Sequence, residues 1–99
     1  MSDNNFELIG NIDTIENTNK SIKSNNSDYL NTINNMSSLL DTLSTVFTGS
    51  ISDSYISSYK NYLESMKKLH KFNEEITGTI DKVTTEYKEN EVQYVSQNL

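Results

Sequence analysis

The stretch STVFTGSISDSY, residues 44–55, interrupts a chain whose pattern is otherwise helical. It places Gly49, one of only three glycines, two residues after Phe47. Glycine readily adopts the positive φ that ends a helix, and the serines and Asp53 that follow can cap a new one. The stretch therefore predicts a turn between two helices near the middle of the 99-residue chain.

Before the turn, apolar residues recur with the seven-residue spacing of a packed helix face. One row is complete, whereas a second row is apolar near the turn and polar at Asn19 and Asn26. Asparagine is a mediocre helix former, so we expect the first half of this helix to be its looser half. The first row comprises Ile15, Ile22, Tyr29, Met36 and Leu43, and the second comprises Ile33, Leu40 and Phe47.

After the turn the pattern is stronger, because two apolar rows alternate in steps of four and three residues over more than four heptads. Such alternation is typical of a packed helix seam. Asn73 is the single polar residue in these rows. The first row comprises Tyr55, Tyr62, Leu69, Ile76 and Val83, and the second comprises Tyr59, Met66, Asn73, Ile80 and Tyr87.

These patterns predict an all-α fold, in which residues 1–99 form a single antiparallel helix-turn-helix hairpin. We expect a helix over about 6–46, a turn over about 47–51, a second helix over about 52–90 and a frayed C-terminal tail. Only 33% of the residues are hydrophobic, and two amphipathic helices side by side leave apolar surface bare. Dimerisation into a four-helix bundle is the simplest way to bury that surface. The expected dimer or core seam comprises Ile22, Tyr29, Met36, Leu40, Leu43, Tyr55, Tyr62, Met66, Leu69, Ile76, Ile80 and Val83.

Composition excludes several classes of function. The net charge is −6 and arginine is absent, so we expect no nucleic-acid partner, because neutralisation of phosphates supplies most of that affinity. No apolar run approaches the roughly 20 residues that cross a bilayer, so we expect no stable membrane insertion. The first residues, MSDNNFELIG, lack a basic region and a continuous apolar run, which argues against a cleaved signal peptide. Composition alone thus indicates a soluble cytoplasmic protein.

No catalytic or metal-binding constellation is recognisable in the sequence. His70, the only histidine, lies one step off the predicted seam among lysines, and we expect it to be a solvated surface residue. A metal site needs several convergent ligands, and a nucleophilic serine needs a base beside it; neither spacing occurs. We therefore expect a protein that is not an enzyme and that uses no cofactor and no metal.

A hairpin of about a hundred residues with an aromatic-x-Gly turn resembles the WXG-type (ESAT-like) small secreted proteins of the type VII secretion pathway. The resemblance covers essentially the whole chain. Phe47-Thr48-Gly49 matches the Trp-x-Gly motif, with Phe in place of Trp, and Tyr55 falls where family members tend to carry an aromatic. Near the C-terminus, YKENE supplies the family's tyrosine–acid pair as Tyr87 and Glu91.

The resemblance implies a virulence-associated protein, made in the bacterial cytoplasm and secreted as a folded dimer without a cleaved signal peptide. It implies a homodimer or a heterodimer with a related helical hairpin, the secretion-system ATPase as a partner, and a larger toxin as a further candidate partner. Phe47 can either close the hairpin core or form part of an export signal. Tyr87 can likewise belong to the seam or, together with Glu91, to the secretion signal.

Three functional hypotheses are open at this point. The leading one is a type VII secretion substrate or effector that acts as a dimeric helical binding or adaptor protein. The second is a dedicated, chaperone-like targeting partner for a larger secreted toxin. The third is a coiled-coil subunit that is not secreted. Membrane disruption after secretion is disfavoured by the acidic charge and the modest hydrophobicity.

Overall fold

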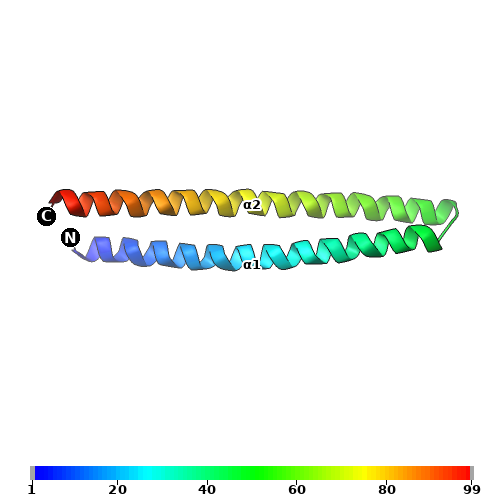
Figure 1. Ribbon diagram of the computed structural model, residues 1–99, viewed down its shortest axis with the longest axis horizontal. Helices are drawn as coiled ribbons and strands as arrows, with labels where there is room; N and C mark the ends of the chain where they lie inside the picture. Colours follow the sequence, from blue (N-terminus) through cyan, green and yellow to red (C-terminus); the bar gives the residue numbers. More distant parts are fainter. Residues whose placement is uncertain (1, 99) are drawn as a thin grey trace.

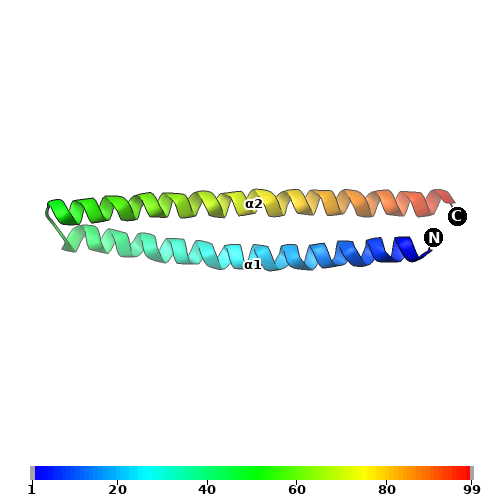
Figure 2. The ribbon, with the colours of Figure 1, turned by 180° about the vertical axis from the view of Figure 1, so that it is seen from behind.

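The protein is a single hairpin of two long antiparallel helices, as the sequence predicts (Figure 1). The computed structural model describes the backbone of residues 2–98 and the side chains of residues 10–90. Helix α1 spans Ser2–Val46 and α2 spans Ser50–Asn98, and residues 2–98 contain no β-strand. The hairpin measures 75 × 15 × 15 Å. Figures 1 and 2 show the helices side by side along their whole length, with both chain ends opposite the turn.

The helices extend past the predicted limits. The end of α1 at Val46 agrees with the prediction, but its start at Ser2 precedes the predicted residue 6. Helix α2 begins at Ser50 and continues to Asn98, beyond the predicted end near residue 90. The connection is therefore only Phe47, Thr48 and Gly49. Fraying of the tail stays a prediction, because the side chains from residue 91 onward lie outside the described residues.

Gly49 makes this short turn possible. Its φ is +120°, a conformation that side-chain-bearing residues rarely adopt. The Phe47 amide donates to the Leu43 carbonyl at 2.9 Å and closes α1, while the Asp53 amide donates to the Gly49 carbonyl at 2.9 Å and opens α2. One glycine thus reverses the chain and also supplies the first acceptor of the second helix.

Gly49→Ala is expected to destabilise the hairpin by about 1–2 kcal/mol, because a Cβ at positive φ clashes with its own backbone. No neighbouring atom lies within 4 Å of the position of that Cβ, so backbone conformation alone produces the cost. Gly78→Ala is a matched control, since it is helical and equally open. It should stabilise by about 0.5–1 kcal/mol. Chemical denaturation of both variants measures the difference, and a Gly49 variant as stable as the parent would contradict the prediction.

The interior of the hairpin consists of one row of every seventh residue from each helix. Near the turn the interior is apolar: Ile33, Leu40 and Leu63 are buried, and the Tyr59 hydroxyl donates to the Met36 carbonyl at 3.2 Å. Toward the open end it is mostly polar, although Ile12 is buried there. The inner row of α1 is Ile12, Asn19, Asn26, Ile33 and Leu40, and that of α2 is Ile56, Leu63, His70, Thr77 and Thr84.

The inner row of α2 was not predicted from the sequence, because three of its five residues are polar. Its threonines can be buried because their hydroxyls bond within α2: Thr77 Oγ1 donates to the Glu74 carbonyl at 3.1 Å, and Thr84 Oγ1 to the Ile80 carbonyl at 2.9 Å. The hydroxyl is then satisfied locally and burial costs little. The predicted α1 row also ends earlier than expected, because Phe47 lies beyond the helix end and is 54% exposed.

Candidate functional site

One side of the hairpin carries a long, mostly apolar surface, which we call the apolar face. The two helices contribute to it jointly: Ile15, Ile80 and Val83 line one hollow of about 420 Å³. Ile22, Tyr29 and Leu69 line a second of about 260 Å³. The apolar face comprises Ile15, Ile22, Tyr29, Met36 and Leu43 of α1 with Tyr55, Tyr59, Tyr62, Met66, Leu69, Asn73, Ile76, Ile80, Val83 and Tyr87 of α2.

Much of the apolar face is uncovered in the single hairpin. Tyr55 is 66% exposed, Tyr62 64% and Leu69 50%, and Val83 and Ile76 are also exposed. The predicted seam is therefore not a single buried layer. Leu40 is buried between the two helices, whereas most of the other seam residues lie on the apolar face at the side of the hairpin. Single exposed apolar residues are common on proteins, but a contiguous stripe indicates an interaction site.

None of the residues that form the apolar face is charged. The chain nevertheless has 22 charged residues of either sign, 14 acidic and 8 basic, so their segregation is strong. Burial of an unpaired charge costs far more than burial of apolar surface gains. A face without charges can therefore be covered by a partner with no such penalty.

The opposite side carries ion pairs between the helices, and we call it the polar face. Lys88 forms an ion pair with Glu16 at 2.8 Å near the open end, and Lys23 forms an ion pair with Asp81 closer to the turn. The hydrogen bond to Glu16 raises the pKa of Lys88 above its ordinary value of 10.5. Such exposed pairs contribute little to stability, and they suit a surface that stays in water.

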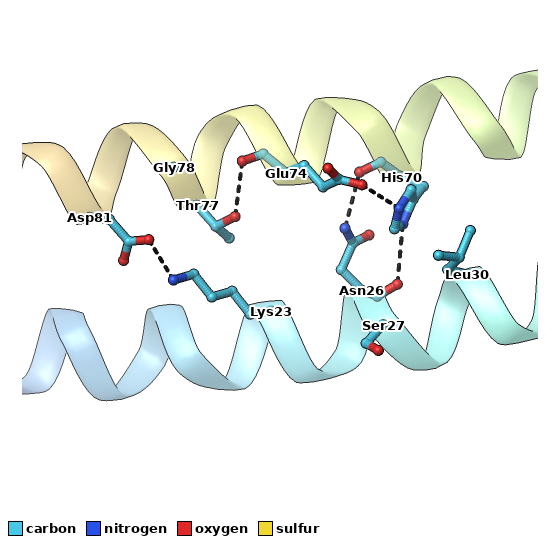
Figure 3. A pocket seen from close by; sticks show the side chains of 9 residues that line it. All are labelled: Lys23, Asn26, Ser27, Leu30, His70, Glu74, Thr77, Gly78 and Asp81. Carbon is cyan, nitrogen blue, oxygen red and sulfur yellow. Dashed lines mark hydrogen bonds and ion pairs between the residues drawn. The ribbon is translucent and has the colours of Figure 1, made fainter.

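The polar face includes a hollow of about 410 Å³, shown in Figure 3. Lys23, Leu30, Gly78 and Asp81 line it, together with a polar cluster around His70. Its acidic groups and its histidine are not arranged for a cation, since residues 10–90 contain no group of three or more metal-ligating side chains placed to hold an ion. The hollow is an open groove between the helices.

His70 is not the solvated surface residue that the sequence predicts. Its side chain is only 13% exposed, Nδ1 donates to the Asn26 carbonyl at 3.2 Å, and Nε2 contacts Glu74 one turn away (Figure 3). The Asn26 amide in turn donates to the His70 carbonyl at 3.0 Å. The prediction failed because His70 lies in the unrecognised inner row of α2, facing α1.

The two asparagines of the inner α1 row bind across to α2. Asn19 Nδ2 donates to the Thr77 carbonyl at 3.1 Å and to Asp81 Oδ1 at 2.9 Å. Asn26 Oδ1 accepts from Asn73 Nδ2 at 3.2 Å. Buried polar groups are costly unless they are bonded, and here most are, although Asn19 Oδ1 has no partner among the described residues. Hydrogen bonds thus replace apolar packing at these levels.

The residues that resemble secretion motifs lie at opposite ends of the hairpin. Phe47 and Gly49 form the turn, where Phe47 lines a hollow of about 250 Å³ with Leu43 and Tyr55. Tyr87 lies near the open end, half exposed on the apolar face. Glu91 continues α2, but its side chain lies outside the described residues. Within one chain the two motifs are therefore separated by most of the hairpin's length.

Phe47→Ala is expected to destabilise the hairpin by only about 1–2 kcal/mol, because roughly half of the ring is already in water. Leu63→Ala is the contrasting variant, since Leu63 is 3% exposed in the apolar interior and its truncation should cost about 2–5 kcal/mol. Thermal unfolding of both variants compares them. A loss for Phe47→Ala as large as that for Leu63→Ala would show that the ring is buried in the assembled protein.

Comparisons with family models, with curated proteins and with solved structures find no match to this chain. Of the helices described, none combines the length and apolar character that a membrane crossing requires.

Proposed function

We propose that this protein acts by binding: its apolar face packs against another helical hairpin to form a four-helix bundle, and the assembled protein is exported by a type VII secretion pathway. The observation that carries the proposal is the long, uncharged and largely exposed apolar face. A second copy and a related hairpin are the two candidate partners, and the pairing itself is the function that the geometry supports best.

The size of the face supports pairing. A stable interface buries about 800 Å² on each partner, and one side of a hairpin of 75 × 15 Å exceeds that. Full burial of a leucine or isoleucine stabilises by roughly 1.5–3 kcal/mol, so covering half-exposed residues such as Leu69 contributes about 1 kcal/mol each. Several such residues together can offset the cost of association.

Export rests on the motif residues. Phe47 and Tyr87 are both half exposed in the single hairpin, which supports their role in a signal. Because they lie at opposite ends of one hairpin, a turn motif and a tail motif come together only between two chains that lie head to tail. In this proposal, pairing completes the surface that a secretion ATPase recognises, and a larger toxin can take the place of the second hairpin.

Light scattering after size-exclusion chromatography of the isolated chain tests the pairing. We expect a mass of two chains at micromolar concentration. A well-folded single hairpin that binds no related chain would overturn the proposal. If the chain dimerises only with a second, different chain, it is a dedicated targeting partner. A stable dimer that never leaves the cell would instead favour a coiled-coil subunit that is not secreted.

A further inference from the structure

Near the middle of its length the apolar face carries a bonded pair of asparagines, Asn73 within the face and Asn26 at its inner edge. Asn25, Asn26 and Asn73 line the hollow of about 260 Å³, together with Ile22, Tyr29 and Leu69. We call these three asparagines the amide layer. Asn26 and Asn73 bond each other at 3.2 Å, and Asn25 is exposed. An amide pair among apolar side chains is costly to cover unless the covering surface offers hydrogen bonds.

The amide layer coincides with the midpoint of the hairpin. The midpoint of Ser2–Val46 is Ser24, and that of Ser50–Asn98 is Glu74. Asn25, Asn26 and Asn73 all lie within two residues of these midpoints. Central placement matters because two copies that overlap over their whole length, in either direction, bring their midpoints together.

We propose that the amide layer fixes the register of a homodimer by contacting the amide layer of a second copy. The inference rests on the proposed pairing of the apolar face and commits it to one partner, a second copy of this chain. In this dimer Asn73 determines the alignment of the two hairpins. The apolar residues of the face could pack equally well in several alignments, whereas the asparagines meet in only one of them.

The two amide layers can meet in both symmetric arrangements in which the apolar faces of two copies pack together. A two-fold axis across the helices places the turn of one hairpin at the open end of the other, whereas an axis along the helices places the two turns together. In each case, two copies that overlap over their whole length place the midpoint of one chain over the midpoint of its partner. The amide layers therefore meet in either in-register dimer, and they separate when the hairpins slip.

The chemistry of the amide favours this self-contact. A carboxamide is both donor and acceptor, so it complements an identical group across a two-fold axis. Among the described residues, Asn73 uses only one N–H, toward Asn26, and its Oδ1 makes no bond. A slip of one heptad, about 10.5 Å along the helices, would bury these groups against apolar layers instead. A single buried asparagine fixes register in coiled coils for the same reason.

Charge and area are both compatible with a second copy as the partner. Each chain carries a net charge of −6, which would repel a copy, but the contacting face itself is uncharged. The charged groups remain on the polar face and the outer surface of the dimer. The area available, on a side of 75 × 15 Å, meets the need of a stable homodimer.

A spin-label distance measurement tests the register. The chain has no cysteine, so Lys68→Cys on the exposed outer surface can carry one label per protomer. We expect one narrow distance between labels in the parent dimer. Asn73→Leu should keep helicity and bind as tightly or up to about 10-fold tighter, but it should show at least two distances or one broad distribution, because slipped hairpins are displaced by about 10 Å along the helices. Asn61→Leu, the same change on the exposed side of α2, should keep the single distance.

Each remaining outcome contradicts the inference in a different way. If Asn73→Leu keeps the single narrow distance of the parent, the pairing stands and the amide layer does not set its register. Several distances in the parent would also overturn the inference. If the parent is monomeric and shows no distance, the proposed homodimer itself fails. If circular dichroism shows that Asn73→Leu does not fold, Asn73→Ala is measured in its place. It too is expected to lose the single narrow distance of the parent.

Discussion

Ile76→Glu is expected to separate the bundle into single hairpins, weakening association by at least about 100-fold. The carboxylate would lie in the middle of the uncharged apolar face, so covering it would require burial of an unpaired charge. A 100-fold loss corresponds to about 2.7 kcal/mol, well within the cost of such burial. Ile76 is already 39% exposed in the single hairpin, so the glutamate can stay in water there and helicity should be retained. Sedimentation or light scattering measures the change in mass.

Ile51→Glu is the matched control for this prediction. Ile51 is an isoleucine of the same helix and is 86% exposed, but it lies at the turn, where it lines the hollow beside Phe47 at the very end of the apolar face. The same substitution there should leave the dimer essentially unchanged. If Ile76→Glu stays dimeric while Ile51→Glu separates the chains, the contact surface is at the tip of the hairpin and the apolar face is not the interface.

Glu91→Ala is expected to leave helicity and melting temperature unchanged but to reduce export at least about 10-fold. A carboxylate that binds a receptor through charge-assisted hydrogen bonds contributes about 1.5–3 kcal/mol, and its removal weakens recognition by one to two orders of magnitude. Glu91 lies four residues after Tyr87, on α2 beyond the last residue of the apolar face. The measurement is the ratio of extracellular to cellular protein in a host with a type VII system.

Glu89→Ala serves as the control for export. It removes the same charge from the same helix, and Glu89 is exposed and lacks the spacing to Tyr87. Equal export of the Glu91 variant and the parent would identify the tyrosine–acid spacing as a chance match. Equal loss in both variants would indicate a dependence on overall acidity, without a role for the motif.

The sequence predicted the architecture because its strongest signals are local. Gly49 is needed for a positive φ whatever surrounds it, and the end of α1 at Val46 follows from it. The absence of proline leaves both helices uninterrupted, and the seven-residue rows identify which residues share a side. The chemistry of the apolar face was therefore readable from the sequence, including its lack of charge and its single polar residue, Asn73.

The sequence by itself thus determined two helices, their turn and an uncharged apolar face, since each depends on backbone conformation or on spacing along one chain. Only the tertiary structure decided which row of α2 faces α1. That choice depends on how each helix is rotated against the other, and hydropathy favoured the wrong row because Thr77, Thr84 and His70 are polar. Their burial is possible because the threonine hydroxyls bond within α2 and His70 bonds Asn26 across the hairpin. Those partners are set by three-dimensional contact, which spacing along the chain does not encode.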